Sequence, residues 1–187
     1  CSGGVVCDEA VAEICDNGID DDGDDLVDCD DADCDKAPNC NESGTPVNDE
    51  CDAAVSVAAG IVAFTTESAT TSEVVLPKAC TSFGSTTIHN DIWFEWTATC
   101  DGVATISLCP SEGGDADFDT RLAVWSGACG GLEIVACNDD DCAQARSRVE
   151  FPVLCGETYL IQLGAYFEDE VGSGDLAIEC VGGGCGG

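Results

Sequence analysis

The chain has 187 residues, a formal net charge of −33 at pH 7 and 16 cysteines. The negative charge repels nucleic acids and anionic membrane surfaces, so DNA and RNA are excluded as partners and no membrane insertion is expected. A cysteine content this high is typical of disulfide-bonded proteins from oxidising environments. We therefore expect a secreted protein, either extracellular or attached to a cell surface.

Structural zinc is the alternative explanation for the cysteines. The sequence contains no Cys-x2-Cys pair, and His89 is its one histidine. Structural zinc sites are built from closely spaced cysteines and histidines, so the pattern favours disulfides. The disulfide connectivity cannot be assigned from the sequence.

The first predicted element is a short helical turn over residues 11–15, and an aspartate-rich stretch bracketed by cysteines follows it, CDNGIDDDGDDLVDCDDADC. Its aspartates match positions 1, 3, 5, 9 and 12 of a calcium loop, and position 7 would ligate through its carbonyl oxygen. A solvated acidic tract is the alternative, but Gly23 at the turn and the apolar Leu26-Val27 pair favour a loop. The candidate Ca²⁺ ligands are Asp20, Asp22, Asp24, Leu26, Asp28 and Asp31.

This stretch resembles a family of secreted acidic repeats with an aspartate-rich metal-binding motif, and it is similar to the calcium loops of thrombospondin type 3 repeats. The resemblance implies a small calcium-binding module with Ca²⁺ as its cofactor. The sequence departs from the usual loop at two positions, where Asp25 replaces a glycine and Asp31 replaces a glutamate. Nothing marks a copper site, because the chain has no methionine and a single histidine.

A polar segment rich in proline, asparagine and glycine runs from Pro38 to Asn48 and predicts a linker. We place a domain boundary near Glu50, which gives an Asp/Cys-rich module with linker over residues 1–50 and a second domain over residues 51–187. Asn41 begins the sequon Asn41-Glu42-Ser43, a possible glycosylation site in a host that glycosylates.

After residue 50 the chain consists of short runs rich in Val, Ile, Thr, Phe and Trp, separated by Gly, Asp, Asn and Pro, which is typical of strands. The spacing predicts a mainly β fold, an antiparallel jelly-roll-type β-sandwich. The expected strands are 61–66, 73–76, 92–97, 103–109, 121–125, 133–137, 148–151, 158–165 and 175–180. The tryptophans Trp93, Trp96 and Trp125 lie in strand patterns, so core packing is their default role. Trp93 and Trp96 must face opposite sides of a regular strand, which makes one of them a candidate for exposure as a carbohydrate or partner contact.

A second resemblance rests on an ordered set of segments: Asn48-Asp49 with Cys51, then Asp91-Ile92-Trp93-Phe94, then DFDTRLAVW from Asp117, then ACNDD from Ala136, then GETY from Gly156. This order resembles the bacterial pre-peptidase C-terminal domain. The resemblance implies a β-sandwich that is appended to secreted enzymes or built into surface proteins, and that serves binding, folding or secretion.

Acidic and amide side chains crowd two loops of this second domain. They form a possible second Ca²⁺ site if the loops meet at one end of the sandwich; turn formation by Asp and Asn explains the same residues equally well. The candidate ligands are Asp115, Asp117, Asp119, Asn138, Asp139 and Asp140.

Catalysis is not expected. The sequence has no Gly-x-Ser-x-Gly or His-Glu-x-x-His motif, and a lone histidine such as His89 is most often structural. We expect a non-catalytic structural or adhesive protein that self-associates into a homopolymer, such as a surface filament, and that can contact an extracellular protein or polysaccharide. The alternative is a ligand-binding accessory domain of a larger secreted hydrolase.

Overall fold

The structure, a computed structural model, describes residues 44–81, 84–142 and 145–185. The chain divides into two compact units, Cys1–Thr45 and Pro46–Gly187. The predicted helical turn, the predicted calcium loop and the sequon at Asn41 lie outside the described residues. Residues 46–50, which we assigned to the linker on sequence grounds, belong to the second unit.

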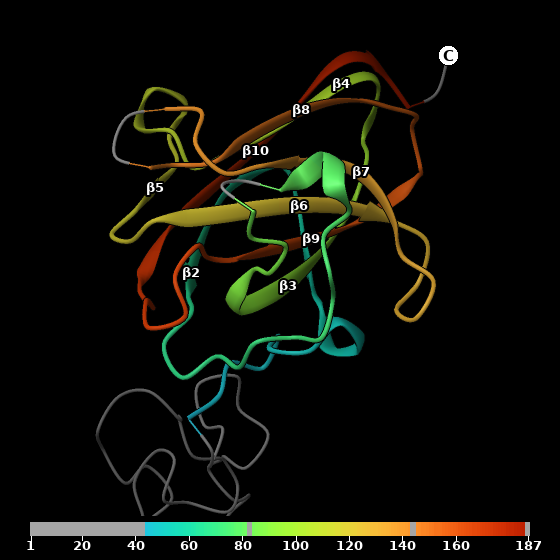
Figure 1. Ribbon diagram of the computed structural model, residues 1–187. Coiled ribbons are helices and arrows are strands. Elements are labelled where there is room, and N and C mark those ends of the chain that lie inside the picture. The colour runs from blue at the N-terminus through green and yellow to red at the C-terminus, as the bar shows by residue number, and fades with distance from the viewer. Residues whose placement is uncertain (1–43, 82–83, 143–144, 186–187) are drawn as a thin grey trace, which may run out of the picture. The chain divides into compact units, whose positions relative to one another are not determined.

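The second unit is a β-sandwich (Figure 1). One sheet has the order β1-β3-β9-β6-β7 and the other has the order β2-β10-β4-β8, with β5 paired to β10. The strands are β1 (Val55–Val57), β2 (Gly60–Thr65), β3 (His89–Thr97), β4 (Cys100–Ser107), β5 (Asp115–Ala116), β6 (Thr120–Ser126), β7 (Glu133–Asn138), β8 (Arg148–Val153), β9 (Thr158–Ala165) and β10 (Ser173–Gly184). Three short 3₁₀ helices lie between them, η3 (Cys51–Ala53), η4 (Lys78–Cys80) and η5 (Pro110–Glu112).

The strand order is that of a jelly roll. When the short strands β1 and β5 are set aside, the other strands numbered in chain order give the sheets 1-8-3-6 and 2-7-4-5. Two interlocked Greek keys produce this arrangement. The predicted fold class is therefore confirmed.

One short edge strand departs from the antiparallel pattern, because β1 pairs with β3 in parallel. The chain enters the sandwich alongside β3, where the Trp93 amide donates to the Asn48 carbonyl at 2.8 Å and Asn48 Nδ2 donates to the Trp93 carbonyl at 3.0 Å. These bonds set the direction of the chain before β1 begins.

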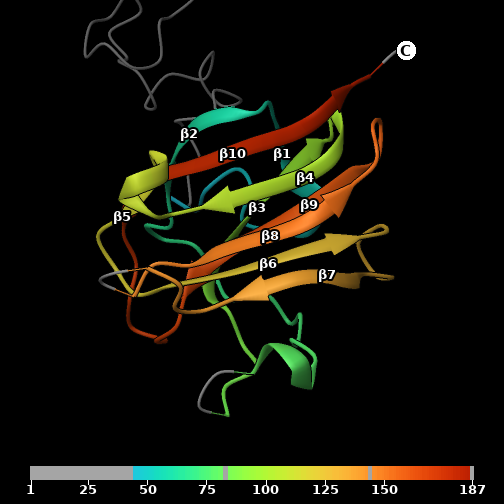
Figure 2. The same ribbon diagram turned by 90° about the horizontal axis from the view of Figure 1, so that it is seen from above.

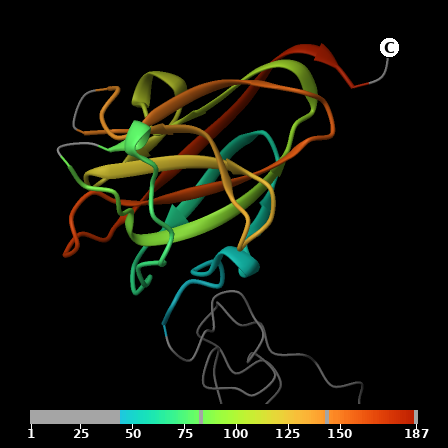
Figure 3. The same ribbon diagram turned by 45° about the vertical axis from the view of Figure 1, so that its right-hand side comes forward.

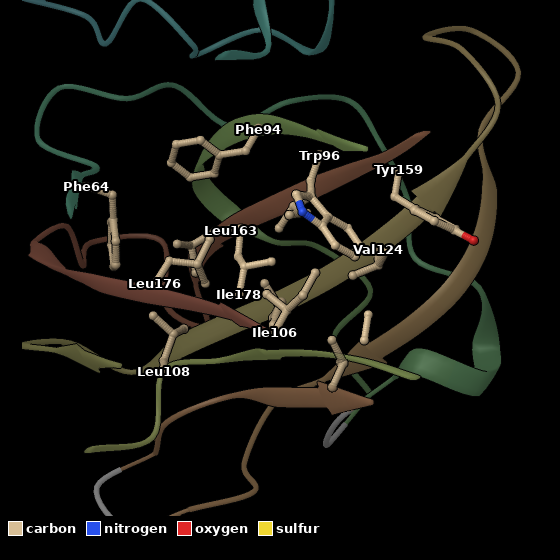
Figure 4. Close-up of a cluster of buried hydrophobic side chains, with 14 of the residues drawn as sticks. Phe64, Phe94, Trp96, Ile106, Leu108, Val124, Tyr159, Leu163, Leu176 and Ile178 are labelled. Carbon is tan, nitrogen blue, oxygen red and sulfur yellow. The ribbon is translucent and has the colours of Figure 1, made fainter. Parts of the chain in front are cut away.

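The main core lies between the two sheets (Figure 4). Inward-facing residues alternate with outward-facing ones along the strands, as strand geometry requires. Phe94 and Trp96 come from one sheet, and Ile106 and Ile178 come from the other; each of these side chains is buried.

A second, smaller core covers the outer face of the sheet that contains β3. Trp93, Trp125 and Leu160 point to this face and pack against Leu76 and Ile88 of the segment between β2 and β3. In Figures 1 and 3 the later part of this segment, in green, crosses over β3 and β6. The default expectation of core packing is confirmed for Trp93 and Trp96, and the candidate exposure of one of them is wrong, because each faces its own core and is 0% or 1% exposed.

The predicted strand at residues 73–76 does not form. Val74 and Leu76 alternate as strand residues do, but they pack onto the second core from an irregular segment. The Leu76 amide donates to the Thr86 carbonyl at 2.8 Å within the same segment. The sequence pattern therefore identified the apolar residues correctly and their backbone conformation wrongly.

A buried arginine and one disulfide fasten this covering segment to the sheet. Arg121 on β6 is 1% exposed, and its guanidinium donates to the carbonyls of Thr87 at 2.7 Å, Cys80 at 3.0 Å and Ser85 at 3.1 Å. The disulfide Cys80–Cys137 joins the segment to β7 covalently, and Cys51–Cys129, which lies outside the segment, packs against the same second core. The buried charge is stabilised because backbone carbonyls satisfy its donors.

Ten cysteines of the described residues form five disulfides, which also include Cys100–Cys180, Cys109–Cys142 and Cys155–Cys185. Disulfides are thus confirmed for these cysteines, and none of them is available as a zinc thiolate. Such a density of disulfides is typical of proteins from oxidising compartments.

The second core predicts a sharp contrast between two neighbouring positions. Leu76 is 4% exposed and Val75 is 67% exposed. Leu76→Ala should lower the free energy of unfolding by about 2–4 kcal/mol, since it leaves a cavity. Val75→Ala should change it by less than about 0.5 kcal/mol. Guanidinium denaturation of the oxidised proteins measures both, and equal effects would show that the segment does not pack as described.

Candidate cation site at one end of the sandwich

The loops after β5, β7 and β9 form an acidic hollow at one end of the sandwich. Its volume is about 310 Å³, and it is lined by Asp119, Asp139, Asp140, Tyr166 and Phe167. Asp119 directly precedes β6, Asp139 and Asp140 follow β7, and Tyr166 and Phe167 follow β9. In a jelly roll these loops reach the same end of the sandwich, which brings distant parts of the sequence together.

Hydrogen bonds hold the wall formed by the loop after β9. The Tyr166 amide donates to the Asp119 carbonyl at 3.0 Å, and the Asp119 amide donates to Glu170 Oε2 at 3.3 Å. Asn90 Nδ2 donates to the carbonyls of Glu168 at 3.0 Å and Glu170 at 2.6 Å. Asn90 has a φ of 49°, a backbone conformation in which asparagine is enriched. These contacts place the Glu170 carboxylate beside Asp119.

The electrostatics of the hollow disfavour a charged Asp119. Burial, followed by repulsion from Asp139, Asp140 and Glu170, raises the pKa of Asp119 to about 6, although Arg146 acts in the opposite direction. Oδ1 of Asp119 is buried and has no hydrogen-bond partner in the described part of the chain. A carboxylate held among like charges in this way is a group that a bound cation would stabilise.

Two arginines border the hollow and offset only part of its charge. Arg121 Nε lies 3.7 Å from Asp139 Oδ1, and its guanidinium carbon lies 5.4 Å from the centre of the Tyr166 ring. Arg146 Nη1 donates to the Phe118 carbonyl at 2.9 Å, and its Nε lies 3.5 Å from Asp115 Oδ1. Both arginines are therefore engaged with other groups of the fold as well as with the acids.

The structure brings three of the predicted second-site residues together, Asp119, Asp139 and Asp140, and gives the other three structural contacts. Asp117 Oδ1 accepts the Ser173 amide at 2.8 Å, and Asn138 Oδ1 accepts the Arg148 amide at 3.1 Å. Asp115 Oδ1 accepts the Ala116 amide at 2.9 Å, next to Arg146. Turn and strand-end chemistry, the alternative noted for the sequence, accounts for these three side chains.

Sequence reasoning missed Glu170, Tyr166 and Phe167. The run Phe167-Glu168-Asp169-Glu170 directly after a long apolar strand was the available signal, because it places acids at a strand end. Phe167 is 48% exposed and packs edge-on against Tyr166, with ring centres 4.8 Å apart.

The acidic side chains that line the hollow would offer carboxylate oxygens to a cation, and Ca²⁺ prefers such hard oxygen ligands. In the described residues no group of three acidic, histidine or cysteine side chains stands in ligating geometry. Binding of an ion would therefore require the carboxylates to rotate toward one another.

His89 lies at the start of β3, and its side chain makes no hydrogen bond to a serine or carboxylate of the described residues. Asp91, the acid nearest to His89 in the chain, instead accepts hydrogen bonds from Ser72 and Gln162. No Ser-His-Asp arrangement is therefore assembled in the part of the chain that the structure describes.

Among the same described residues, no helix has the length and apolar character needed to cross a membrane.

Comparisons with known proteins do not assign a family to the chain. No family model matches the chain, and no curated protein matches it. Among solved structures, the chain is similar to the pre-peptidase C-terminal domain of a collagenase from Bacillus anthracis, with a TM-score of 0.40 and 7% identity. The alignment covers 67% of this chain and 94% of that chain. At this TM-score the match adds no argument to the strand topology described above.

The raised pKa of Asp119 predicts a pH dependence in EDTA. The folded carboxyl, with a pKa of about 6, binds its proton more tightly than an unfolded one near 3.8. This contribution to stability is therefore fully present below pH 3.8 and is lost as the pH rises through about 6. Asp119→Asn should remove this loss of stability at higher pH. With solvent screening taken into account, it should stabilise the protein at pH 7 by roughly 1 kcal/mol.

Urea denaturation at pH 4 and pH 7 measures the effect. Glu179→Gln serves as the control, because it removes one acid from an exposed position on β10. If the free energy of unfolding changes between pH 4 and pH 7 by the same amount in Asp119→Asn and Glu179→Gln, the crowding of charge around Asp119 is not as described.

Proposed function

We propose that this protein is a non-catalytic extracellular structural or adhesive module that is stabilised by disulfides and Ca²⁺. The observation that carries the proposal is the crowding of Asp119, Asp139, Asp140 and Glu170 around one hollow, with the pKa of Asp119 raised by that crowding. Such repulsion lowers stability when Asp119 is ionised, and a bound cation would offset it. Disulfides supply the covalent part of the stability.

Ca²⁺ is the proposed cofactor at two separate places. In the sandwich, Asp119, Asp139 and Asp140 would hold the ion, and Glu170 would complete the set from the loop after β9. In the first unit, the aspartates of the predicted loop, Asp20 to Asp31, would hold another. All of these donors are hard oxygen ligands, which select Ca²⁺ over softer metals.

Self-association into a filament is part of the proposal and needs the same cations. A net charge of −33 on each copy opposes contact between copies. Divalent ions that neutralise carboxylates would lower this barrier. The last strand is not free to be donated to a neighbour, because β10 pairs with β2 and β4 and Cys185 is bonded to Cys155. Contacts between copies would therefore use other surfaces.

Calcium titration of the full chain by calorimetry tests the metal proposal. The unmodified protein should bind Ca²⁺ in at least two classes of site. Asp119→Asn combined with Asp140→Asn should abolish the class in the sandwich, and Asp22→Asn should weaken the other class by tenfold or more, because each change removes ligand charge.

Glu179→Gln combined with Glu133→Gln is the matched control, since it removes the same charge from exposed strand positions. If this control reduces Ca²⁺ binding as much as Asp119→Asn combined with Asp140→Asn does, the ions bind diffusely to the acidic surface and the proposed site in the sandwich is wrong.

Calcium should also control assembly. Sedimentation velocity and negative-stain microscopy of the full chain should show monomers in EDTA and higher species or filaments in millimolar Ca²⁺, because neutralised carboxylates no longer keep copies apart. A protein that stays monomeric with its calcium sites filled would instead fit the accessory-domain alternative.

A further inference from the structure

Four strands form the edges of the two sheets: β1 and β7 in one, β2 and β8 in the other. An edge strand presents unpaired backbone N–H and C=O groups, which are a template for another strand. Natural proteins protect such edges with prolines, charges, short length or covering segments. The four edges here differ in which of these protections they have.

Three of the edges are protected. β8 contains Pro152 and carries the charges of Arg148 and Glu150. β7 is joined to the covering segment by the Cys80–Cys137 disulfide. β1 has only three residues. Each of these features opposes the addition of another strand.

The edge at β2 has none of these protections. Its sequence, Gly-Ile-Val-Ala-Phe-Thr, contains no charge and no proline. Figure 2 shows β2 beside β10 at the outer limit of its sheet. Apart from its ladder with β10, no backbone hydrogen bond joins β2 to any other described residue. Ile61 is 56% exposed beside this open edge.

The surface next to β2 is acidic. Asp175 on β10 lies directly opposite Ala63 in the register, and Glu179 lies further along β10 on the same face. Glu67 follows the end of β2. All three acids are exposed. A strand added to β2 would therefore meet an uncharged backbone edge bordered by negative side chains.

We propose that β2 is a docking edge for an extended polypeptide segment that carries lysine or arginine side chains. The segment extends the sheet by one strand, with its backbone hydrogen-bonded to β2 and its basic side chains near Asp175, Glu179 and Glu67. Main-chain bonds supply the affinity in this mode of recognition, and alternate side chains supply the specificity. This inference goes beyond the proposed function, because it names a partner chemistry and does not depend on bound Ca²⁺.

Charge complementarity decides between the possible occupants. A second copy of this chain would bring another net charge of −33 to an acidic surface, whereas a basic segment gains attraction and a faster encounter from the same field. A basic partner is therefore favoured over self-pairing at this edge.

The experiment uses the full oxidised chain and fluorescent peptides of alternating lysine and valine, Ac-(Lys-Val)₄-NH₂. Fluorescence anisotropy at physiological salt should show saturable binding. The (Glu-Val)₄ peptide should bind at least tenfold more weakly. The (Lys-Pro)₄ peptide, which has the same charge but cannot donate ladder hydrogen bonds from its prolines, should also bind at least tenfold more weakly.

Two matched variants locate the binding. Ala63→Lys places a positive charge on the exposed face of the edge strand, and it should weaken (Lys-Val)₄ binding by tenfold or more. Thr158→Lys makes the same charge change at an exposed position of interior strand β9 in the other sheet, where Thr158 lies opposite Thr97, and it should change binding by no more than about twofold. Hydrogen exchange should show new protection of β2 amides with the peptide.

The remaining outcomes overturn the proposal. Equal binding of the (Lys-Pro)₄ peptide, or equal losses in the two variants, would mean general electrostatic attraction. The absence of measurable binding, or protection confined to other strands, would exclude β2 as the site. Amides of β2 that are already protected in the chain without peptide would assign the edge to the chain's own residues 1–43 or to a second copy.

Discussion

Positive charge is scarce in this protein, so ion pairs can neutralise only a small part of its negative charge. The whole chain has five lysines and arginines against 38 acidic residues. The three arginines lie on or near β6 and β8, and each one touches at least one carboxylate: Arg121 meets Asp139, and Arg148 donates to Glu112. Ion pairs on this scale cannot hold the fold. Buried apolar side chains and disulfides do so instead.

Arg121 shows how the few cations are used. Its guanidinium is buried and donates to backbone carbonyls of the covering segment, so it serves mainly as a hydrogen-bond donor in the interior of the protein. Loss of such a group would leave several carbonyls unsatisfied, which is more costly than the loss of a surface ion pair. The layer that covers Trp93 thus depends on one residue of β6 and on the disulfide Cys80–Cys137.

The sequence predicted the sandwich because inward and outward positions alternate clearly along its long strands, as in residues 92–97 and 158–165. The sequence analysis failed at β3, because both faces of this strand pack against a core and apolar residues therefore occupy inward and outward positions alike. One of Trp93 and Trp96 was a candidate for exposure, and that expectation holds only for a sandwich of two layers. The irregular segment that forms the third layer has no periodicity of its own, so its apolar residues Val74 and Leu76 were assigned to a strand.

The candidate site was predictable to the extent that it depends on strand ends. Asp119 and Asp139 border strands that the pattern identified, so their convergence followed from the topology. Which oxygens remain available did not follow, because Asp117 and Asn138 are equally placed in sequence and yet accept backbone amides. That choice is set by loop geometry, which residue spacing does not encode. Glu170 was missed for a related reason, since its role depends on the hydrogen bonds of Asn90 to the same loop.

The two proposed sites make opposite uses of the same negative charge. Calcium in the acidic hollow would reduce the field that attracts a basic segment to β2, and a bound segment would reduce the field that attracts calcium; such coupling must be reciprocal. Arg146 is the physical connection, because it lies beside Asp115, the partner of Asp175 across β5 and β10, and also lowers the pKa of Asp119. Exposed charges are screened within about 8–10 Å at physiological salt, so the coupling between the sites is weak. Each site can therefore be filled, or fail to be filled, without the other, while the disulfides hold the sandwich in both cases.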